Sequence, residues 1–397
     1  MQDSVFHSNN NKNKVQGISN DEGRICHNIA DLQIGFIGLG LIGGSIARAL
    51  KNINSKIRLI AYDHNTDKAN SDLQAALSDK VLNNVTKSLE EGFSDCDIIF
   101  LCAPVLANIA YLHKLKPIIK PECILTDVGS VKGNIHSEVE QLNLEAQFIG
   151  GHPMTGSEKT GYHNSYALLL ENAYYILTPT KKVSQDKVAK LKHIVSLMGS
   201  IPVLLEAKEH DEITATISHL PHIIAAQLVN LVRNSDDKSE KMRILAAGGF
   251  KDITRIASSS PIMWQNICLT NSTSIRRLLN NYIESLKEFS NALSQKDEDY
   301  LYQIFDTASD YRSSIPNTAK GILARVYEIY LDITDEAGAI ATIATQLAVN
   351  QISIKNIGII HNREFAEGVL RIEFYDQESA DKAVNVLNHF HYNIYVR

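Results

Sequence analysis

The sequence is poor in cysteine and has no long hydrophobic run. Only five of its 397 residues are cysteine, and no two form a C-x-x-C pair. This argues against a disulfide framework or a zinc knuckle and favours a reducing cytoplasm. No stretch of 18 apolar residues occurs, and the first 30 residues hold no apolar run, so we expect neither a membrane span nor a signal peptide. The net charge of −6 argues against nucleic acid as the main partner.

The composition is that of an ordinary globular protein, 44% hydrophobic and 21% charged. Residues 1–30 are polar, so we expect a disordered tail, with a docking segment as the alternative. Residues 31–206 alternate short apolar strands with helical stretches, which predicts a parallel α/β sheet. Residues 207–315 are almost continuously helical and predict an all-α domain. Residues 322–397 follow the order β-α-β-β-α-β of a small α+β ferredoxin-like module.

Individual elements can be placed from these patterns. Strands of the α/β part are expected at Ile34–Ile37, Ile57–Tyr62, Asp97–Cys102, Cys123–Thr126, Phe148–Ile149, Ala173–Leu177 and Pro202–Leu205. Helices of the all-α part are expected at Glu209–Val232, Lys238–Ala247, Pro261–Leu293 and Glu298–Ser313. Pro221 lacks a backbone N–H and is expected to kink the first of these helices.

A glycine-rich turn follows the first expected strand and opens a helix. It reads Gly38-Leu39-Gly40-Leu41-Ile42-Gly43, a G-x-G-x-x-G pattern. Such glycines permit a tight turn, close approach of the backbone to a pyrophosphate and close helix packing, while the helix N-terminus attracts phosphate. The pattern therefore predicts a dinucleotide site. A glycine turn in a fold that binds no nucleotide is the alternative.

Residues at two further strand ends fit the same site. Asp63 lies 20 residues past Gly43. Its carboxylate could bind ribose hydroxyls and would repel a 2′-phosphate, which favours NAD over NADP. Ala103 and Pro104 follow the expected strand Asp97–Cys102, where small residues would let the nicotinamide lie close. Asp63 as a strand cap and Ala103-Pro104 as a plain turn are the alternatives.

Four polar clusters follow expected strands or lie on expected helices. They read DVGSVKG from Asp127, GHPMTGSE from Gly151, SHLPH from Ser218 and KDITR from Lys251. The first two follow strands, at the edge where open α/β sheets bind ligands. The two histidines of the third stand at i and i+3 and share one helix face. No cluster has the spacing of a metal site, so no metal is expected.

These clusters resemble the motifs of the prephenate dehydrogenase family. GLGLIGGS, DVGSVKG, GGHPMTGSE, SHLPH and FKDITRIA with Trp264 match the family's motifs, in order, over about residues 33–313. The resemblance implies a Rossmann domain followed by an all-α dimerisation domain. It also implies NAD-dependent conversion of prephenate to 4-hydroxyphenylpyruvate, carbon dioxide and NADH in tyrosine biosynthesis.

The resemblance also implies roles for single residues. His152 would accept the hydrogen of the substrate hydroxyl, and Ser130 would lie between that hydroxyl, His152 and the nicotinamide. Arg255 would hold the ring carboxylate with its planar fork. The other expected substrate contacts are His222, Lys251, His219, Trp264 and Glu158. Each has a structural alternative: a loop hydrogen bond, a core position or a solvated surface position.

The last segment resembles an ACT domain, a module that often binds amino acids for feedback control. Its expected ligand residues are Asp335, Gly338, Asn350 and Ile352, and tyrosine is the expected inhibitor. The long helical middle segment favours a homodimer. Only about 30 residues precede the Rossmann domain, too few for a fused chorismate mutase, so we expect a monofunctional enzyme. Arogenate dehydrogenase and a non-catalytic sensor of NAD and amino acids remain as alternatives.

Overall fold

The computed structural model describes residues 29–63, 71–156, 159–315, 327–333, 336–360, 368–390 and 392–396. The chain forms two compact units, Met1–Ala319 and Lys320–Arg397. The predicted tail lies outside the described residues except at its end, where a short 3-10 helix, η1, spans Ile29–Asp31. Glu158 and Asp335 also lie outside them.

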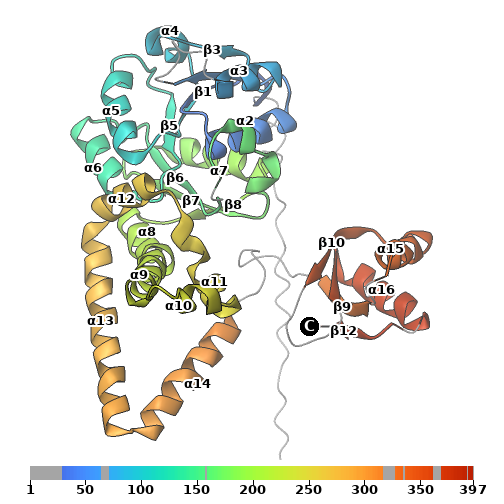
Figure 1. The fold of residues 1–397 in the computed structure, drawn as a ribbon. Coiled ribbons are helices and arrows are strands. Elements are labelled where there is room, and N and C mark those ends of the chain that lie inside the picture. The colour runs from blue at the N-terminus through green and yellow to red at the C-terminus, as the bar shows by residue number, and fades with distance from the viewer. Residues whose placement is uncertain are drawn as a thin grey trace, which may run out of the picture. The chain divides into compact units, whose positions relative to one another are not determined.

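The first unit begins with a five-stranded parallel sheet (Figure 1). Its order is β3 (Asn84–Val85), β2 (Arg58–Tyr62), β1 (Gln33–Ile37), β4 (Ile98–Leu101) and β5 (Ile124–Asp127). Helices α2 (Leu41–Ile53) and α3 (Ser71–Ser78) pack on one face, and α4 (Leu89–Phe93), α5 (Val105–Leu115) and α6 (Gly133–Gln141) on the other. The strand order reverses between β1 and β4, and ligands bind at such a switch point. The predicted Rossmann-type sheet is confirmed.

A second sheet extends the first. It contains β6 (Ile149–Pro153), β7 (Tyr174–Pro179) and β8 (Ile201–Leu204), in that order. One parallel bridge, Leu125 to Phe148, joins it to β5. The prediction of a wholly parallel sheet is wrong here, because β6 and β7 are antiparallel. Among the described residues that connect them, the regular elements are only the 3-10 turns η2 (Tyr162–Asn164) and η3 (Ala167–Leu170). By contrast, α7 (Gln185–Leu197) supplies the crossover that parallel β7 and β8 need.

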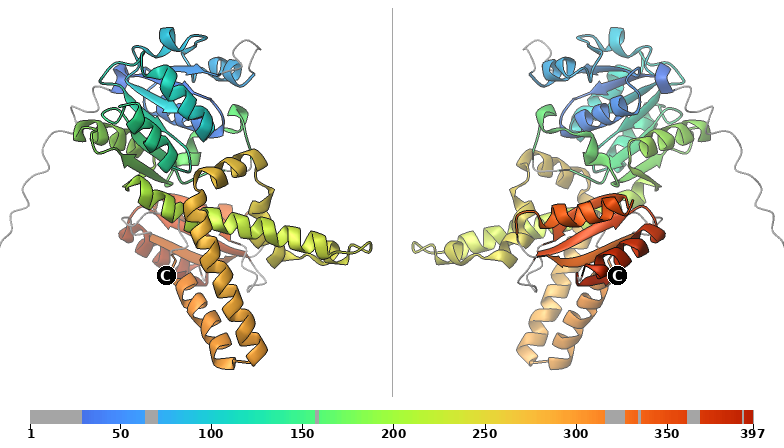
Figure 2. Two further views of the ribbon diagram at one scale, coloured as in Figure 1. Left: turned by 90° about the vertical axis from the view of Figure 1, so that its left-hand side faces the viewer. Right: turned by 90° about the vertical axis from the view of Figure 1, so that its right-hand side faces the viewer.

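The helical region follows directly. Its elements are α8 (Ala207–Thr214), the π-helical turn η4 (Ala215–His219), α9 (Leu220–Ser235), α10 (Lys241–Leu245), α11 (Gly248–Thr254), the 3-10 turn η5 (Arg255–Ser258), α12 (Pro261–Thr270), α13 (Ser272–Gln295) and α14 (Glu298–Ser314). The predicted disruption near Pro221 takes the form of the π-helical turn just before it. Figure 2 shows α13 and α14 as a long hairpin.

Two helix predictions need correction. The helix expected at Lys238–Ala247 shrinks to α10, because Gly248 and Gly249 open a separate helix, α11. The helix expected at Pro261–Leu293 is broken at Asn271. The Asn271 side chain donates to the backbone oxygen of Asp211 and to the ring of His219. This tertiary contact holds Asn271 outside helical geometry, which a sequence pattern does not reveal.

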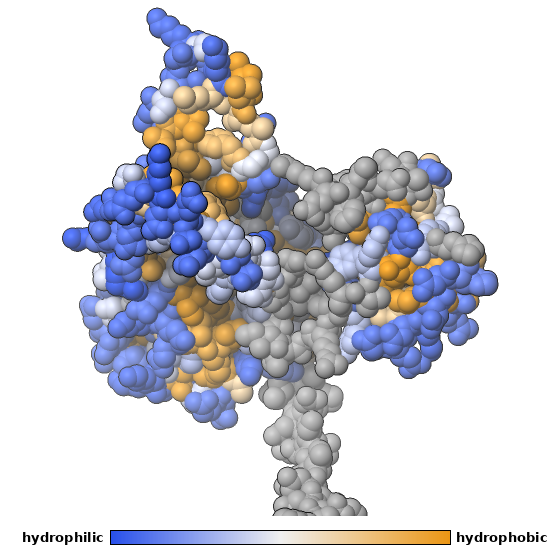
Figure 3. All heavy atoms as spheres, turned by 90° about the horizontal axis from the view of Figure 1, so that it is seen from below, coloured by the Kyte–Doolittle hydropathy of each residue, from blue (hydrophilic) through white to orange (hydrophobic). Residues whose placement is uncertain are grey.

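One helical run is long and apolar enough, by length and composition alone, to cross a membrane. It spans Ala207–Ser235 with a mean hydropathy of 1.2. Our expectation of no membrane span rested on a stricter criterion, 18 consecutive apolar residues, which this run does not meet. In this structure its buried polar residues His210, Asp211 and Thr214 lie in α8, which packs against α6 and β7. Only 17% of its apolar window is buried inside the single chain, and apolar surface on the first unit is visible in Figure 3.

The second unit has the predicted order β-α-β-β-α-β. Its elements are β9 (Tyr327–Ile333), α15 (Ala339–Val349), β10 (Ile354–Ile360), β11 (Gly368–Phe374), α16 (Gln377–His389) and β12 (Ile394–Val396). The sheet order is β10-β11-β9-β12, with antiparallel neighbours. Alternate residues such as Leu331 and Ile372 form a core with the helix residues Leu347 and Leu387. An α+β unit is therefore present.

Candidate active site

The glycine-rich loop connects β1 to α2 in the geometry that a dinucleotide requires. Gly38 has φ +84°, and its N–H donates to the backbone oxygen of Tyr62. A Cβ at Gly43 would lie 2.8 Å from the Gly38 oxygen, so only glycine fits there. A Cβ at Gly40 would meet no atom within 4 Å, which leaves open space beside the N-terminus of α2. Leu41 and Ile42 form the first turn of α2. The chain's own residues thus fit a pyrophosphate at this position.

The other predicted cofactor residues lie at neighbouring strand ends. Asp63 directly follows β2 and is partly exposed. Ala103 follows β4, and its backbone N would lie 3.0 Å from a Cβ at Gly38. Pro104 caps the N-terminus of α5. The fold therefore brings these three residues and the glycine loop to one edge of the sheet.

A buried ion pair fixes the loop after β5 to β6. The ammonium of Lys132 contacts the carboxylate of Asp127 and donates to the backbone oxygen of Gly151 at 2.8 Å. The Asp127 carboxylate also accepts from the backbone N–H groups of Gly129, at 3.0 Å, and Gly151, at 3.1 Å. Lys132 is 0% exposed and Asp127 is 1% exposed. These contacts hold the segment carrying Ser130, which is partly exposed, beside the strand carrying His152.

Replacing Lys132 by methionine is expected to lower the free energy of unfolding by about 3–5 kcal/mol, because removing one partner leaves a buried, uncompensated charge. Urea unfolding followed by circular dichroism measures this. Lys120→Met is the control, since its pair with Asp97 is 35% and 27% exposed and should contribute at most about 1 kcal/mol. Equal losses in both variants would show that the buried pair adds no more than a surface pair.

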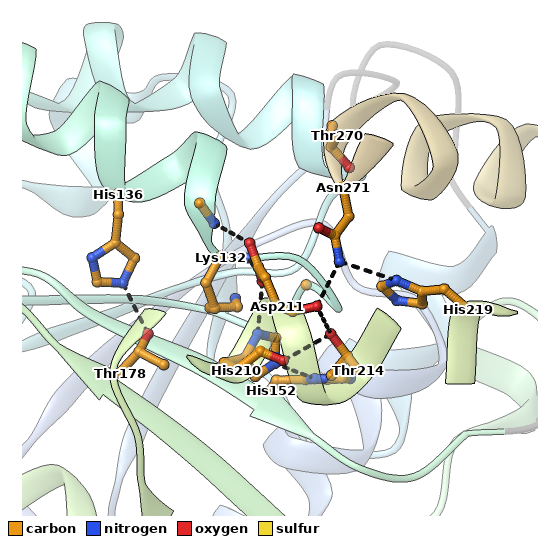
Figure 4. Close-up of polar contacts among 12 residues, drawn as sticks. Lys132, His136, His152, Thr178, His210, Asp211, Thr214, His219, Thr270 and Asn271 are labelled. Carbon is orange, nitrogen blue, oxygen red and sulfur yellow. Dashed lines mark hydrogen bonds and ion pairs between the residues drawn. The ribbon is translucent and has the colours of Figure 1, made fainter. Parts of the chain in front are cut away.

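His152 stands at the centre of the site (Figure 4). It lies near the end of β6, and its Nδ1 is 2.8 Å from Nε2 of His210 on α8. Burial, and then the nearby His210, Lys132 and His219, hold the pKa of His152 well below its ordinary value. The ring is therefore neutral near pH 7 and has one nitrogen able to accept a proton.

The two predicted helix histidines contact one tryptophan. The ring of His222 stacks on Trp264 with centroids 3.8 Å apart, and the ring of His219 meets the same tryptophan edge-on at 6.0 Å. His219 is 1% exposed, and its Nδ1 lies 3.3 Å from Asn271 Nδ2. Burial, which outweighs the charge of Asp211, lowers the pKa of His219 to about 4. The SHLPH segment and Trp264 thus form one cluster.

Two N–H groups of this cluster are buried and have no hydrogen-bond partner among the described residues: His219 Nε2 and Trp264 Nε1. The Asn271 amide donates to His219 Nδ1, so a neutral His219 carries its hydrogen on Nε2. Leaving buried donors unpaired costs about 1–3 kcal/mol each. Both donors are therefore open to a hydrogen-bond acceptor that enters the cluster.

The remaining predicted substrate residues lie nearby or outside the described residues. Arg255 begins η5 and is exposed, and its positive charge helps lower the pKa of His222, after burial. Lys251 lies exposed on α11. Our prediction for Glu158 falls outside the described residues. The structure thus associates Arg255 with the His222 cluster and shows Lys251 only as a surface residue of the adjoining helix.

Three polar residues around His152 and His219 were missed from the sequence: His210, Asp211 and Asn271. His210 and Asp211 are adjacent in a charged stretch, KEHDE, that looks like a solvated helix face. Asn271 sits inside what looked like one helix. A His-Asp pair just after the last strand of an α/β domain was the available signal. Among the described residues, no group of three or more His, Cys, Asp or Glu side chains is arranged to hold a metal ion.

Comparisons with known proteins match this arrangement. The nucleotide-binding domain of prephenate dehydrogenase matches residues 46–203, and the dimerization domain of that enzyme matches residues 206–307. Prephenate dehydrogenase of Bacillus subtilis is 38% identical over 348 residues, 87% of this chain and 93% of the relative. The matched 87% of the 397 residues is more than the whole first unit, Met1–Ala319, contains. The likeness therefore extends into the second unit.

Solved structures agree over the first unit. Prephenate dehydrogenase from Aquifex aeolicus, in complex with hydroxyphenyl propionate and NAD+, has a TM-score of 0.67 and 30% identity, covering 72% of this chain and 98% of that structure. Arogenate dehydrogenase of Synechocystis has a TM-score of 0.64 and 28% identity, covering 72% of this chain and 100% of that structure. With its glycine loop and its histidine-centred site, the chain is an NAD-dependent oxidoreductase that belongs to the prephenate dehydrogenase family.

Proposed function

We propose that the chain oxidatively decarboxylates prephenate with His152 as the base at the ring hydroxyl. The observation that carries this assignment is a neutral histidine near the end of β6. This strand is joined in parallel to β5, so its end lies at the same sheet edge as the glycine loop. NAD, when bound, accepts the hydride from the ring carbon. The hydroxyl proton moves to His152 Nε2, and the ring carboxylate leaves as carbon dioxide. Its bonding electrons complete the aromatic ring as a phenolate, which takes the proton back from His152. A positioned base of this kind contributes about 10²–10⁴-fold.

Ser130 and the His219–Trp264 cluster would hold the substrate in place. Ser130 follows β5 and would donate to the hydroxyl oxygen between His152 and the nicotinamide. The unpaired N–H groups of His219 and Trp264 would bind substrate oxygens. His222 donates from Nδ1 to the Ser218 backbone oxygen at 3.1 Å, so its neutral ring offers only an acceptor at Nε2. Arg255, with Lys251 as a weaker candidate, would bind the carboxylates.

The activity test is NADH formation at 340 nm with prephenate and, separately, with arogenate. We expect a higher kcat/KM for prephenate. A preference of about 100-fold corresponds to roughly 2.7 kcal/mol of transition-state discrimination. Turnover of arogenate alone would reassign the substrate but keep the mechanism. NAD binding without turnover of either substrate would favour the sensor that the sequence left open.

We also propose that the chain is a homodimer that acts in the cytoplasm. The helical region carries large apolar side chains that are exposed in the single chain: Ile217, Leu231, Ile244, Leu245, Ile253 and Leu269. Figure 3 shows apolar patches on this surface. An open hollow near α10 and α11 is lined by Val232, Met242, Leu245 and Phe250. Exposed patches of this kind mark interfaces, and a second copy would cover them.

We further propose that the second unit is an ACT domain that binds tyrosine. Gly338 has φ +97° and caps α15, and Asn350 caps its other end. Ile352 is buried in the core, so its side chain supports the ligand turn rather than facing the ligand. Asp335 belongs to the same expected ligand loop.

The expected result is that tyrosine lowers kcat even at saturating prephenate, and that a chain ending at residue 315 loses this inhibition. Initial rates with both proteins over a tyrosine titration measure it. Inhibition that saturating prephenate abolishes, and that the shortened chain retains, would place tyrosine in the active site instead.

A further inference from the structure

A row of three side chains leads from α8 to His152 (Figure 4). His210 Nε2 lies 2.8 Å from His152 Nδ1, and His210 Nδ1 lies 2.8 Å from Asp211 Oδ1. His210 is 0% exposed and Asp211 is 8% exposed. His152 belongs to the α/β domain, and the other two belong to the helical region. Water has little access to His210 and Asp211, so the protein sets the geometry of these two side chains.

The surroundings of Asp211 determine where the hydrogens lie. Oδ1 also accepts from the backbone N–H of Lys132, and Oδ2 accepts from the backbone N–H of Gly133, both at 2.7 Å. A carboxylate with three donors at the start of α6 acts only as an acceptor. The hydrogen between Asp211 and His210 therefore belongs to His210 Nδ1.

The position of the hydrogen on His210 in turn determines the position of the hydrogen on His152. A neutral His210 with its hydrogen on Nδ1 offers a lone pair at Nε2. Only one hydrogen fits between two nitrogens 2.8 Å apart, so His152 must donate from Nδ1. The free lone pair of His152 is then at Nε2, the only nitrogen left to face a substrate hydroxyl.

We infer that His210, oriented by Asp211, is a positioning residue that holds His152 in the tautomer whose Nε2 accepts the substrate proton. This inference rests on the proposed function. After the proton reaches Nε2, His152 is an imidazolium, and its Nδ1–H remains bonded to the lone pair of His210. The Nδ1 hydrogen therefore stays in place while the proton on Nε2 passes back to the phenolate oxygen of the product.

A neutral histidine beside His152 affects the pKa of His152 differently from a carboxylate in the same position. A carboxylate in direct contact with His152 would favour the charged ring and so raise the pKa of the base. A neutral imidazole orients the ring without adding a negative charge next to it. This fits the low pKa of His152, which burial lowers most. The charge of Asp211 is placed one ring further away.

Two replacements of His210 separate orientation from packing. His210→Asn keeps an amide near the Nδ1 position, which can still pair with Asp211, but it is too short to accept from His152. His210→Gln keeps an amide oxygen near the Nε2 position, which can accept from His152. We expect His210→Asn to lower kcat by about 10- to 100-fold, the usual cost of losing such an outer partner. His210→Gln should restore most of the loss, and KM for NAD should change less than about threefold in both.

A matched control and a spectroscopic readout complete the test. His136 is partly buried, and its Nε2 lies 2.8 Å from Thr178 Oγ1 rather than near His152. His136→Asn loses that contact in the same way and should keep kcat within about twofold. The ¹⁵N shifts of the His152 ring, assigned by comparison with His152→Asn, should show a bare Nε2 in the wild type and a mixture of tautomers in His210→Asn.

The outcomes are distinguishable. Full kcat in His210→Asn, or equal losses in the Asn and Gln variants with an unchanged His152 tautomer, would overturn the positioning role. A wild-type His152 with its hydrogen on Nε2 would overturn it without any variant. Should His210→Asn fail to fold, His210→Gln and the wild-type spectrum still decide. Failure of the proposed function would appear separately, as a wild-type chain that does not turn over prephenate.

Discussion

Replacing His152 by asparagine is expected to lower kcat with prephenate at least 10²-fold. Asparagine keeps an amide near the Nδ1 position and can still donate to His210, so the local packing survives. It has no group at the Nε2 position that can take the hydroxyl proton. NAD affinity should stay nearly unchanged, because the glycine loop and Asp63 lie on other strands. Steady-state NADH formation and calorimetric NAD titration measure the two quantities.

The pH dependence of kcat/KM in the wild type also tests the role of His152. Because burial lowers the pKa of His152 below its ordinary value, the neutral base persists at lower pH than for an exposed histidine. We therefore expect kcat/KM to stay flat as pH falls to about 6.5 and to decline only in more acidic solution.

The control for the kcat of His152→Asn is His136→Asn, which should keep nearly the wild-type kcat. Normal turnover in His152→Asn would remove His152 from the mechanism.

Replacing Arg255 by glutamine is expected mainly to raise KM for prephenate, by about ten- to a hundredfold. The glutamine side chain can still donate a hydrogen bond but lacks the charge and the planar fork that match a carboxylate. Hydrogen bonds to charged groups contribute about 1.5–3 kcal/mol, which converts to this range. The larger free-energy cost of breaking a buried ion pair does not apply here, because Arg255 is exposed.

The control for Arg255 is a second exposed arginine of the helical region. Arg312 lies in the last turn of α14, and Arg312→Gln should leave KM and kcat unchanged. Initial rates over a range of prephenate concentrations at saturating NAD compare the three proteins. An Arg255→Gln enzyme with the KM of the wild type would show that Arg255 does not bind substrate, and a fall in kcat alone would assign it to the chemical step.

The sequence by itself determined the features that depend on local pattern. Buried strands, the glycine turn and the loop after β5 follow from short-range periodicity and from residues with special backbone needs, such as Gly38. The order of elements in the second unit was predicted in the same way. The cluster of His219, His222 and Trp264 could be outlined because the two histidines share a helix face and Trp264 completes a motif.

The tertiary structure decided what depends on residues far apart in the chain. The antiparallel pairing of β6 with β7 follows from the missing crossover helix. The helix break at Asn271 is set by its bonds to Asp211 and His219, 60 and 52 residues away. His210 and Asp211 look like a solvated helix face until α8 packs against α6. The packing of the folded core determines which groups form hydrogen bonds there. Sequence periodicity predicts which face of a helix or strand is buried, but it does not predict which residues pack against that face.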